Sequence, residues 1–359
     1  MKKVLLRFYD KHNLGDDLFV KVITERYENH FSLLVLKDNQ FLQNIKHLTI
    51  YNNTAFYLFC KAIEKLFGIR NIWLGMLAKR HDLLVYIGGS IFIEDNNIQK
   101  WKNEQNFYRG LSAPYYILGS NFGPYKNSEF ISLISDIFRG AKDVCFRDNA
   151  SYELFKELDT TRVATDIAFS LDTSKYKIKN EKIAVFSIIN CADRFDKKVA
   201  DKYDQETVNM TRQLIKGGYK VVYMSFCKYE GDEDAIQRIM NNFNKDIVNN
   251  VEAFNYDGNL EEALSLIAKC EIIVASRFHG VILGLLFSKK VLPMAYSKKT
   301  SNILNDLKFK GDIIDINTID TFDGNKFDFD SLQINNVDKQ VQLADLQFQE
   351  LDKVLVRKN

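Results

Sequence analysis

At 359 residues the chain exceeds the usual size of one domain, so its length predicts two domains, each able to bury its own core. Hydrophobic residues make up 46% of the chain and charged residues 27%, and 49 basic against 47 acidic residues leave a formal net charge of +2. These values are typical of a globular protein and give no indication of a nucleic-acid partner.

The sequence shows neither a membrane span nor a secretory signal. No run of about 18 apolar residues occurs, and the apolar stretch near the N-terminus is too short for a signal peptide. The five cysteines are odd in number, scattered and mostly flanked by apolar residues, which predicts reduced core thiols rather than disulfides or a zinc site. We therefore expect a soluble cytoplasmic protein.

Short apolar runs rich in β-branched residues alternate with amphipathic stretches, as buried parallel strands alternate with helices. The predicted strands are 3–9, 32–37, 82–89, 114–120, 143–148, 182–189, 219–226, 270–277, 289–296 and 311–316. The predicted helices are 16–27, 128–139, 149–158, 201–216, 232–242, 259–268 and 280–287. This repeated β-α order predicts an α/β protein with two doubly wound, Rossmann-like domains.

The polar stretch at 172–182 separates two such β-α series and predicts the linker. The expected domains are an N-terminal one at 1–175 and a C-terminal one at 176–335, and apolar spacing in 336–359 predicts a closing helix that returns to the first domain. Open α/β sheets bind ligands beyond the carboxyl ends of their strands. Two such domains facing each other predict a cleft, in which residues just after strands contact the ligand.

The turn after the first strand contains Asn13, Gly15 and Asp16. In a structural interpretation, Gly15 supplies backbone freedom and Asp16 caps the next helix. In a functional one, Gly15 lets a ligand approach the helix N-terminus while Asn13 or Asp16 binds a sugar hydroxyl. The spacing alone does not choose between them.

The stretch 55–80 combines many large apolar residues with charges that are all basic except Glu64. It fits either two helices packed in the core or a surface that contacts an anionic bilayer.

Gly88, Gly89 and Ser90 end another predicted strand. The adjacent glycines allow a substrate to approach the backbone closely, or simply form a tight turn. Because no complete G-x-G-x-x-G or Walker pattern occurs, the dinucleotide and NTP fingerprints are absent.

Arg147 directly follows a predicted strand, and Asp148 or Asn149 can cap the helix after it. This placement fits an anion site or a salt bridge across the interdomain face. Asp166 follows a further short strand, where an aspartate can cap a helix, pair with an arginine or transfer protons.

The segment Ser276–Gly280 lies between an apolar strand and an apolar helix and carries Arg277 and His279. Helix-start N–H groups attract anions, a guanidinium binds carboxylate or phosphate bidentately, and an imidazole moves protons near neutral pH. Tyr296 and the lysine at position 299 follow the next strand. The acidic run 232–234 fits a helix N-terminus better than a metal site.

In order, the motifs "NLGDDL", "YIGGSIF", "GSNFGPY", "CFRDNASYELF", "TDIAF" and "ASRFHGVILGLLFSKKVLPMAYSKK" resemble the polysaccharide pyruvyl transferase family, over about residues 4–307. Arg277 and His279 match the family's arginine-apolar-histidine segment, and Tyr296 with Lys299 matches its later tyrosine-x-x-lysine. Arg147 with Asp148 matches an arginine-aspartate pair before a helix. Two positions differ: serine stands at 90 where a third glycine is common, and threonine at 165 where proline is frequent.

The resemblance implies a two-domain fold similar to the glycosyltransferase B type, and transfer of pyruvate from phosphoenolpyruvate onto two hydroxyls of a sugar as a ketal. No metal or other cofactor is implied. Acceptors in the family range from lipid-linked oligosaccharides to cell-wall glycans and N-glycans. For this chain we expect a sugar of a bacterial-type polysaccharide, such as an exopolysaccharide or capsule, or its lipid-linked precursor, with peripheral contact at the inner membrane face where the acceptor is membrane-bound.

On this basis we assign expected roles to the motif residues. His279 is the acid-base group, and Arg277 and Asp166 complete the catalytic set. The expected donor-binding residues, mainly in the second domain, are Arg147, Ser276, Arg277, Gly280, Tyr296 and Lys299. The expected acceptor-binding residues, in the first domain, are Asn13, Gly15, Asp16, Gly88, Gly89 and Ser90. The alternatives are a nucleotide-sugar glycosyltransferase of the same fold and a non-catalytic glycan-binding protein.

Overall fold

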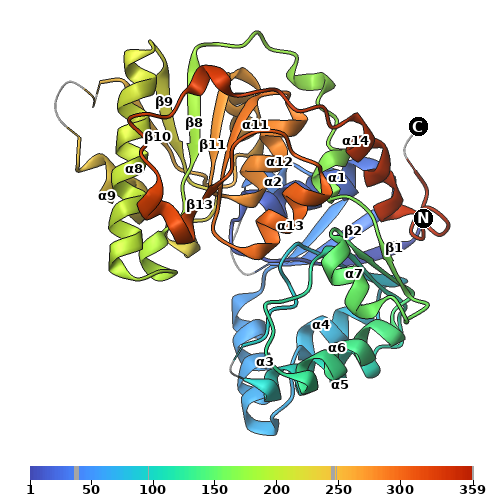
Figure 1. Ribbon diagram of the computed structural model, residues 1–359. Helices are drawn as coiled ribbons and strands as arrows, with labels where there is room; N and C mark the ends of the chain where they lie inside the picture. The colour runs from blue at the N-terminus through green and yellow to red at the C-terminus, as the bar shows by residue number, and fades with distance from the viewer. Residues whose placement is uncertain (36–39, 96, 244–246, 248, 358–359) are drawn as a thin grey trace. The chain divides into compact units, whose positions relative to one another are not determined.

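The computed structural model describes residues 1–35, 40–95, 97–243, 247 and 249–357 (Figure 1). The chain forms two compact units. Unit 1 comprises Met1–Asp10, Leu18–Ser170 and Lys339–Asn359, and unit 2 comprises Lys11–Asp17 and Leu171–Asp338. The chain thus passes from unit 1 to unit 2 just before the predicted linker, and its last segment belongs to unit 1. The prediction placed Lys11–Asp17 in the first domain, whereas the contacts of this segment assign it to unit 2.

Unit 1 is built on a seven-stranded parallel sheet in the order β3-β2-β1-β4-β5-β6-β7. The strands are β1 (Lys3–Arg7), β2 (His30–Leu34), β3 (Leu48–Tyr51), β4 (Leu83–Ile87), β5 (Tyr115–Ser120), β6 (Asp143–Phe146) and β7 (Thr161–Val163). The inner strands are apolar on both faces because helices cover both sides of a parallel sheet. The strand order reverses between β1 and β4, the usual position of a ligand crevice in a doubly wound fold.

The helices of unit 1 are α1 (Leu14–Arg26, whose first turn belongs to unit 2), α2 (Gln40–Gln43), α3 (Thr54–Phe67), α4 (Ile72–Ala78), α5 (Ile98–Arg109), α6 (Ser128–Gly140) and α7 (Asn149–Phe155). Helix α4 supplies Trp73, Leu74 and Leu77 to the core, whereas α3 buries only Cys60 and Glu64. Of the two interpretations of 55–80, core packing therefore describes α4, whereas α3 buries few of its side chains. Figure 1 shows the positions of the two helices in unit 1.

Unit 2 repeats the design with a six-stranded parallel sheet in the order β10-β9-β8-β11-β12-β13. The strands are β8 (Ile183–Ser187), β9 (Lys220–Met224), β10 (Val251–Phe254), β11 (Ile272–Ala275), β12 (Lys290–Ala295) and β13 (Ile314–Asp315). The helices are α8 (Lys197–Lys216), α9 (Asp232–Met240), α11 (Leu260–Lys269), α12 (Phe278–Leu286) and α13 (Lys298–Asp306). Here the strand order reverses between β8 and β11. The prediction of two doubly wound α/β units is confirmed.

The C-terminal segment differs from the single closing helix predicted for it. Helix α14 (Asp338–Ala344) is followed by a 3₁₀ turn at Asp345–Phe348 and by further turns, and residue 358 of the predicted helix lies outside the described residues. Buried Gln347 explains the early end, because its side-chain amide accepts from Gly119 N–H and donates to the carbonyls of Phe146 and Thr165. These bonds hold the segment on unit 1 more specifically than an apolar helix face would.

The cysteines and the lengths of the apolar helices bear on two predictions made from the sequence. All five cysteines are buried free thiols, as predicted. Within the described ranges, no helix is both long enough and apolar enough to cross a bilayer.

Candidate active site

The candidate site of unit 2 begins at the carboxyl ends of β8 and β11, where the strand order reverses. Ser187 ends β8, and its hydroxyl oxygen accepts the backbone N–H of Arg277 at 3.1 Å. A Cβ added to Gly280 would lie 2.5 Å from the same hydroxyl oxygen, so Gly280 allows α12 to approach β8 closely. Ser276 is buried, and its hydroxyl lies 2.9 Å from the hydroxyl of Tyr203. These contacts fix the first turn of α12 against the sheet.

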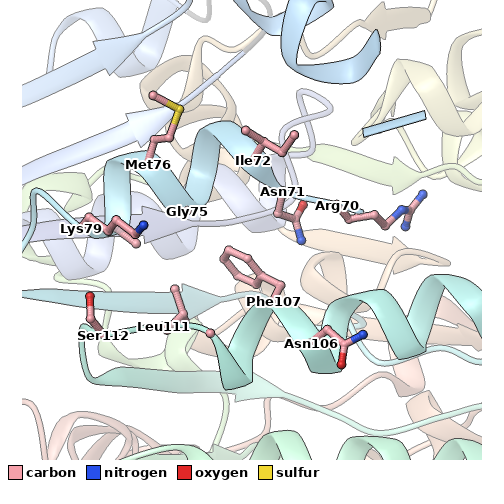
Figure 2. A pocket seen from close by; sticks show the side chains of 12 residues that line it. Arg70, Asn71, Ile72, Gly75, Met76, Lys79, Asn106, Phe107, Leu111 and Ser112 are labelled. Atoms are coloured by element: carbon pink, nitrogen blue, oxygen red, sulfur yellow. The ribbon is translucent and has the colours of Figure 1, made fainter. Parts of the chain in front are cut away.

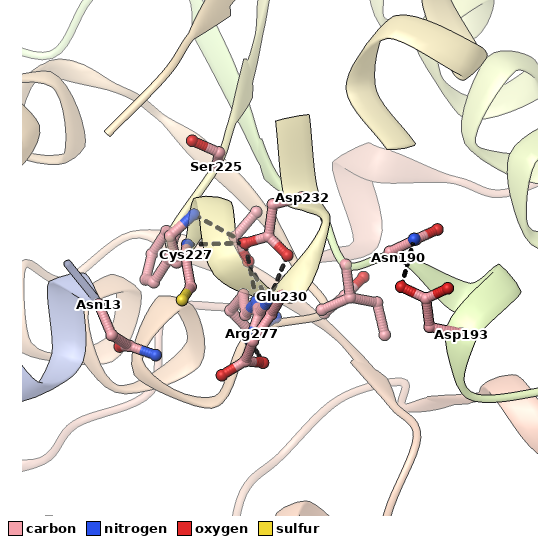
Figure 3. A network of polar contacts seen from close by, with 12 residues as sticks. Asn13, Asn190, Asp193, Ser225, Cys227, Glu230, Asp232 and Arg277 are labelled. Carbon is pink, nitrogen blue, oxygen red and sulfur yellow. Dashed lines mark hydrogen bonds and ion pairs between the residues drawn. The ribbon is translucent and has the colours of Figure 1, made fainter. Parts of the chain in front are cut away.

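Arg277 lies at the N-cap of α12, and its guanidinium makes internal ion pairs (Figure 3). Nε donates to Asp232 at 3.0 Å, Nη2 donates to the other oxygen of the same carboxylate, and Nη1 donates to Glu230 at 2.5 Å. Burial acts against the guanidinium's charge, but the two carboxylates outweigh it and raise the pKa of Arg277. Arg277, which the sequence predicts to bind the donor, therefore has its charge balanced by two carboxylates and its side chain fixed by them.

Asp232 anchors this arrangement from the first turn of α9. Besides Arg277, its Oδ2 accepts the backbone N–H groups of Phe226 and Cys227, both at 2.9 Å. A fully buried carboxylate needs this many donors to remain charged. The acidic run 232–234 does start a helix, as predicted, and the oxygens of Asp232 are engaged by protein donors rather than arranged for a metal ion.

Glu230 is held between two guanidinium groups. Its Oε2 accepts from Arg277 and, at 2.6 Å, from Nη2 of Arg194. Burial alone would raise the pKa of Glu230, but the two arginines lower it below the ordinary value. The Arg194 guanidinium also lies 5.2 Å from the ring centre of Tyr296, which follows β12. Two arginines thus bind one carboxylate at this strand-end edge, and one of them also contacts the Tyr296 ring.

The segment Lys11–Asp17 joins this site. Leu14 N–H donates to the carbonyl of Phe226 at 3.0 Å, and the Cys227 thiol donates to the carbonyl of Lys11 at 3.5 Å. Tyr256, from unit 2, donates its hydroxyl to Asp17 at 2.6 Å. The predicted location in the first domain is therefore wrong for this segment, because its bonding partners lie more than 200 positions away in the chain.

Helix α1 begins at Leu14, two residues before the predicted start. The side-chain oxygen of Asn13 accepts Gly15 N–H at 3.0 Å, and the Asn13 carbonyl accepts the N–H groups of Asp16 and Asp17. Asn13 therefore starts the helix, and Asp16 lies buried in its first turn rather than at its cap.

Gly15 lies directly against His279. A Cβ added to Gly15 would be 1.8 Å from Nδ1 of the imidazole, a distance at which no side chain fits. His279 is in the first turn of α12, two residues after Arg277. Position 15 requires a glycine because the His279 imidazole lies so close to its backbone. The structure thus brings together the predicted acid-base group and a residue predicted to bind the acceptor.

Unit 1 has its own cluster of strand-end side chains. Arg147 is buried, and it donates to Asp166 at 2.8 Å and to the side-chain oxygen of Asn121 at 2.7 Å. A Cβ on Gly89 would lie 2.6 Å from this guanidinium, and the hydroxyl of Ser90 donates to Asn121. Arg147 thus pairs with an aspartate of its own unit.

The remaining predicted residues have simpler positions. Gly88 is buried and donates its N–H to the carbonyl of Leu118 at 3.2 Å. Asp148 caps α7 by accepting Ser151 N–H at 2.8 Å, as predicted. Lys299 lies in the first turn of α13, and its side chain is outside the described part of the structure.

Sequence reasoning missed Glu230, Arg194 and Asn121. Glu230 lies two residues before Asp232, and a buried arginine needs a carboxylate nearby. That signal could have directed attention from Arg277 to the acidic stretch after β9. Arg194 and Asn121 belong to irregular loops, and no local pattern distinguishes them.

The fold is that of several sugar-processing enzymes. HepE from Anabaena, solved with UDP and glucose, superposes with a TM-score of 0.58 and 13% identity over 98% of each chain. UDP-GlcNAc 2-epimerase from Methanocaldococcus jannaschii superposes with a TM-score of 0.57 and 10% identity over 98% of this chain and 99% of that one. At such identities the likeness shows the fold alone, two Rossmann-like domains of the glycosyltransferase B type.

Sequence comparison adds the family. The amylovoran biosynthesis protein AmsJ of Erwinia amylovora is 23% identical over 259 residues, which are 64% of this chain and 60% of AmsJ. The match therefore spans less than two thirds of that relative's length. The family model of polysaccharide pyruvyl transferase matches residues 13–298, which include both the Asn13 turn and the Arg277–His279 segment. The chain belongs to the polysaccharide pyruvyl transferase family.

Proposed function

We propose that this protein transfers pyruvate from phosphoenolpyruvate onto two hydroxyls of a sugar in a polysaccharide or lipid-linked precursor, forming a ketal and releasing phosphate. Family membership supports the reaction class. The observation that carries the proposal is the position of His279, packed on Gly15 and two residues from a guanidinium at the strand-order reversal of unit 2. A proton-transfer group and a cation cluster at the place where such sheets bind ligands suit this donor.

The donor requires cationic partners for a carboxylate and a phosphate. In the structure Glu230 accepts from both Arg277 and Arg194, so it occupies the position that an anionic substrate group would take. We propose that one anionic group of phosphoenolpyruvate displaces the Glu230 carboxylate and binds the two guanidiniums. Asp232, with bonds to two backbone N–H groups, keeps Arg277 in place during the exchange.

The chemistry then needs one proton delivered to carbon. Protonated His279 donates it to the methylene carbon of phosphoenolpyruvate, and the first sugar hydroxyl adds to the adjacent carbon, losing its proton. The bond from that carbon to the phosphate oxygen breaks, and phosphate leaves with its charge stabilised by the arginines. The second hydroxyl attacks the same carbon and closes the ring. Of the two hydroxyl protons, one returns to the neutral His279 and the other goes to the departing phosphate, so the products are a pyruvate ketal and inorganic phosphate.

Replacing Glu230 by glutamine tests the displacement step. Because E230Q removes the charge that competes for Arg277 and Arg194, we expect the KM for phosphoenolpyruvate to fall roughly three- to tenfold, from a gain on the order of 1 kcal/mol. Steady-state phosphate release at varied phosphoenolpyruvate measures it.

Glu233→Gln is the matched control, since Glu233 lies three residues further on, in the first turn of α9, and pairs with Lys228 instead. Its KM should remain that of the wild type. A KM that rises in E230Q would show that Glu230 assists donor binding rather than competing with it.

The remaining roles are also proposals. Asn13 and Asp16 share unit 2 with His279, and Gly88, Gly89 and Ser90 lie in unit 1; we retain all five, with Gly15, as acceptor-binding candidates. Arg147, paired with Asp166, and Tyr296 and Lys299 remain candidates for the donor, in a reaction that uses no metal or other cofactor.

Phosphate release that requires both phosphoenolpyruvate and a sugar acceptor tests the proposed function. The likeness to HepE makes nucleotide-sugar transfer the alternative, because that protein was solved with UDP and glucose. Thermal stabilisation by UDP-glucose, without phosphate release from phosphoenolpyruvate, would favour the glycosyltransferase. Stabilisation by glycan alone, without turnover of either donor, would favour a glycan-binding protein.

A further inference from the structure

Helix α3 of unit 1 has an apolar surface directed away from the protein core. Four of its large apolar side chains are exposed: Leu58 at 60%, Phe59 at 60%, Leu66 at 77% and Phe67 at 67%. We propose that this surface, which we call the α3 face, binds an anionic lipid bilayer. The inference concerns a binding surface and does not depend on pyruvyl transfer being the reaction.

Helix α3 packs Phe56 and Tyr57 against the core but leaves large apolar residues exposed on its other side. Its buried residues are Cys60 and Glu64. The Glu64 carboxylate accepts the backbone N–H of Ile72 at 2.9 Å and the ammonium of Lys61 at 2.6 Å. The helix therefore directs its one acid inward, where two donors satisfy it, and Phe56 packs on Trp73, whereas Leu58, Phe59 and Leu66 remain exposed. Such exposure in a folded protein marks an interaction surface.

Most of the exposed side chains form a stripe along one side of α3, and Phe67, at the end of the helix, lies outside it. At about 100° per residue, Leu58, Phe59, Ala62 and Leu66 lie within one side of the helix, and Lys65 borders that side. Ile69 (48% exposed), just after α3, and Met76 (42% exposed), on α4, are further exposed apolar residues of this stretch. The stripe is long enough to lie along an interface rather than to fill a single pocket.

The basic residues near the α3 face indicate that its binding partner is anionic. Within the stretch 55–80 the charged residues are all basic apart from the inward-facing Glu64, and they are Lys61, which pairs with Glu64, and Lys65, Arg70, Lys79 and Arg80. A second copy of the chain packed symmetrically would set this basic border against itself, which is unfavourable. Anionic headgroups complement the border, and acyl chains complement the stripe. The surface therefore fits a bilayer better than a second copy.

A pocket beside the α3 face adds a place for a headgroup. It has a volume of about 310 Å³ and lies between α4 and α5 (Figure 2). Arg70, Lys79 and Asn106 supply donors to its lining, whereas the Asn71 amide donates to Glu104, and the exposed side chain of Met76 also lines the pocket. Cationic and amide donors next to an apolar stripe suit a lipid phosphate at the interface.

Vesicle co-sedimentation tests the proposal, using phosphatidylcholine vesicles with and without phosphatidylglycerol. We expect the full chain to bind the anionic vesicles and to lose binding at high salt. The double variant Phe59→Ser, Leu66→Ser should weaken partition about tenfold for each side chain removed. Lys65→Glu should weaken it at least about fivefold through two units of charge.

Controls use similarly exposed residues elsewhere on unit 1. Leu154→Ser (42% exposed in the wild type) and Lys142→Glu should bind as the wild type does, and circular dichroism should show all variants folded. Equal binding by the double variant and the wild type would overturn the proposal, as would equal binding to neutral and anionic vesicles. A wild type that sediments as a dimer, with a monomeric double variant, would show that a second copy covers the α3 face instead.

Discussion

We expect His279→Ala to fold as the wild type does and to lose pyruvyl transfer by about 100- to 10,000-fold in kcat. The imidazole is only partly buried, so its removal costs little packing, but the reaction loses the group that protonates the methylene carbon. The measurement is phosphate release from phosphoenolpyruvate in the presence of a sugar acceptor, with the melting temperature recorded for the same preparation.

His81→Ala is the matched control. His81 is also partly buried, and its Nδ1 lies 2.7 Å from the Leu77 carbonyl in unit 1. We expect this variant to keep its turnover. A His279→Ala enzyme with near wild-type kcat would contradict the acid-base assignment, whatever the control shows.

Gly15→Ala should reduce turnover almost as strongly as His279→Ala does, although it removes no functional group. The added methyl would lie 1.8 Å from Nδ1 of His279, so the imidazole must leave its position or the α1 turn must move. Overpacking of this kind costs about 1–3 kcal/mol of stability, and a displacement of about 1 Å lowers kcat about 100-fold. We would measure kcat and the free energy of unfolding together.

Gly75→Ala provides the comparison. The nearest atom to a Cβ at that position is on the Phe107 ring at 3.7 Å, an ordinary contact, so stability and turnover should both be retained. A Gly15→Ala enzyme with unchanged kcat would show that the contact between Gly15 and His279 is not needed for the reaction.

The fold could be predicted where burial produces continuous apolar runs. The strands β4, β8 and β11 are buried on both faces of their sheets, so their sequences are continuous apolar runs. The edge strands β3 and β10 were missed because β3 is half-buried throughout and β10 buries only Val251, so neither shows an apolar run. The predicted strand 32–37 is observed at His30–Leu34, and residues 36 and 37 lie outside the described ranges. Helix α5 was missed because its sequence is mostly polar.

The sequence predicts which segments form the site, but not which residues from other segments contact them. Arg277 and His279 lie between a predicted strand and a predicted helix. Their side-chain types alone indicate that this segment binds an anion and transfers a proton. The sequence does not show that Asp232 and Glu230 neutralise Arg277, since those contacts cross more than 40 positions. It likewise does not show that Gly15 contacts His279 across the chain. Both are tertiary contacts between different β-α repeats, which local patterns do not encode.

The central claim is that pyruvate moves from phosphoenolpyruvate to a sugar through His279. The most direct measurement is the mass of the acceptor after incubation with carbon-labelled phosphoenolpyruvate, over a panel of lipid-linked and synthetic glycosides. We predict that the wild type adds one labelled pyruvate as a ketal to at least one acceptor and that His279→Ala does not. An acceptor that gains a hexose from UDP-glucose, and no label from phosphoenolpyruvate, would contradict the claim.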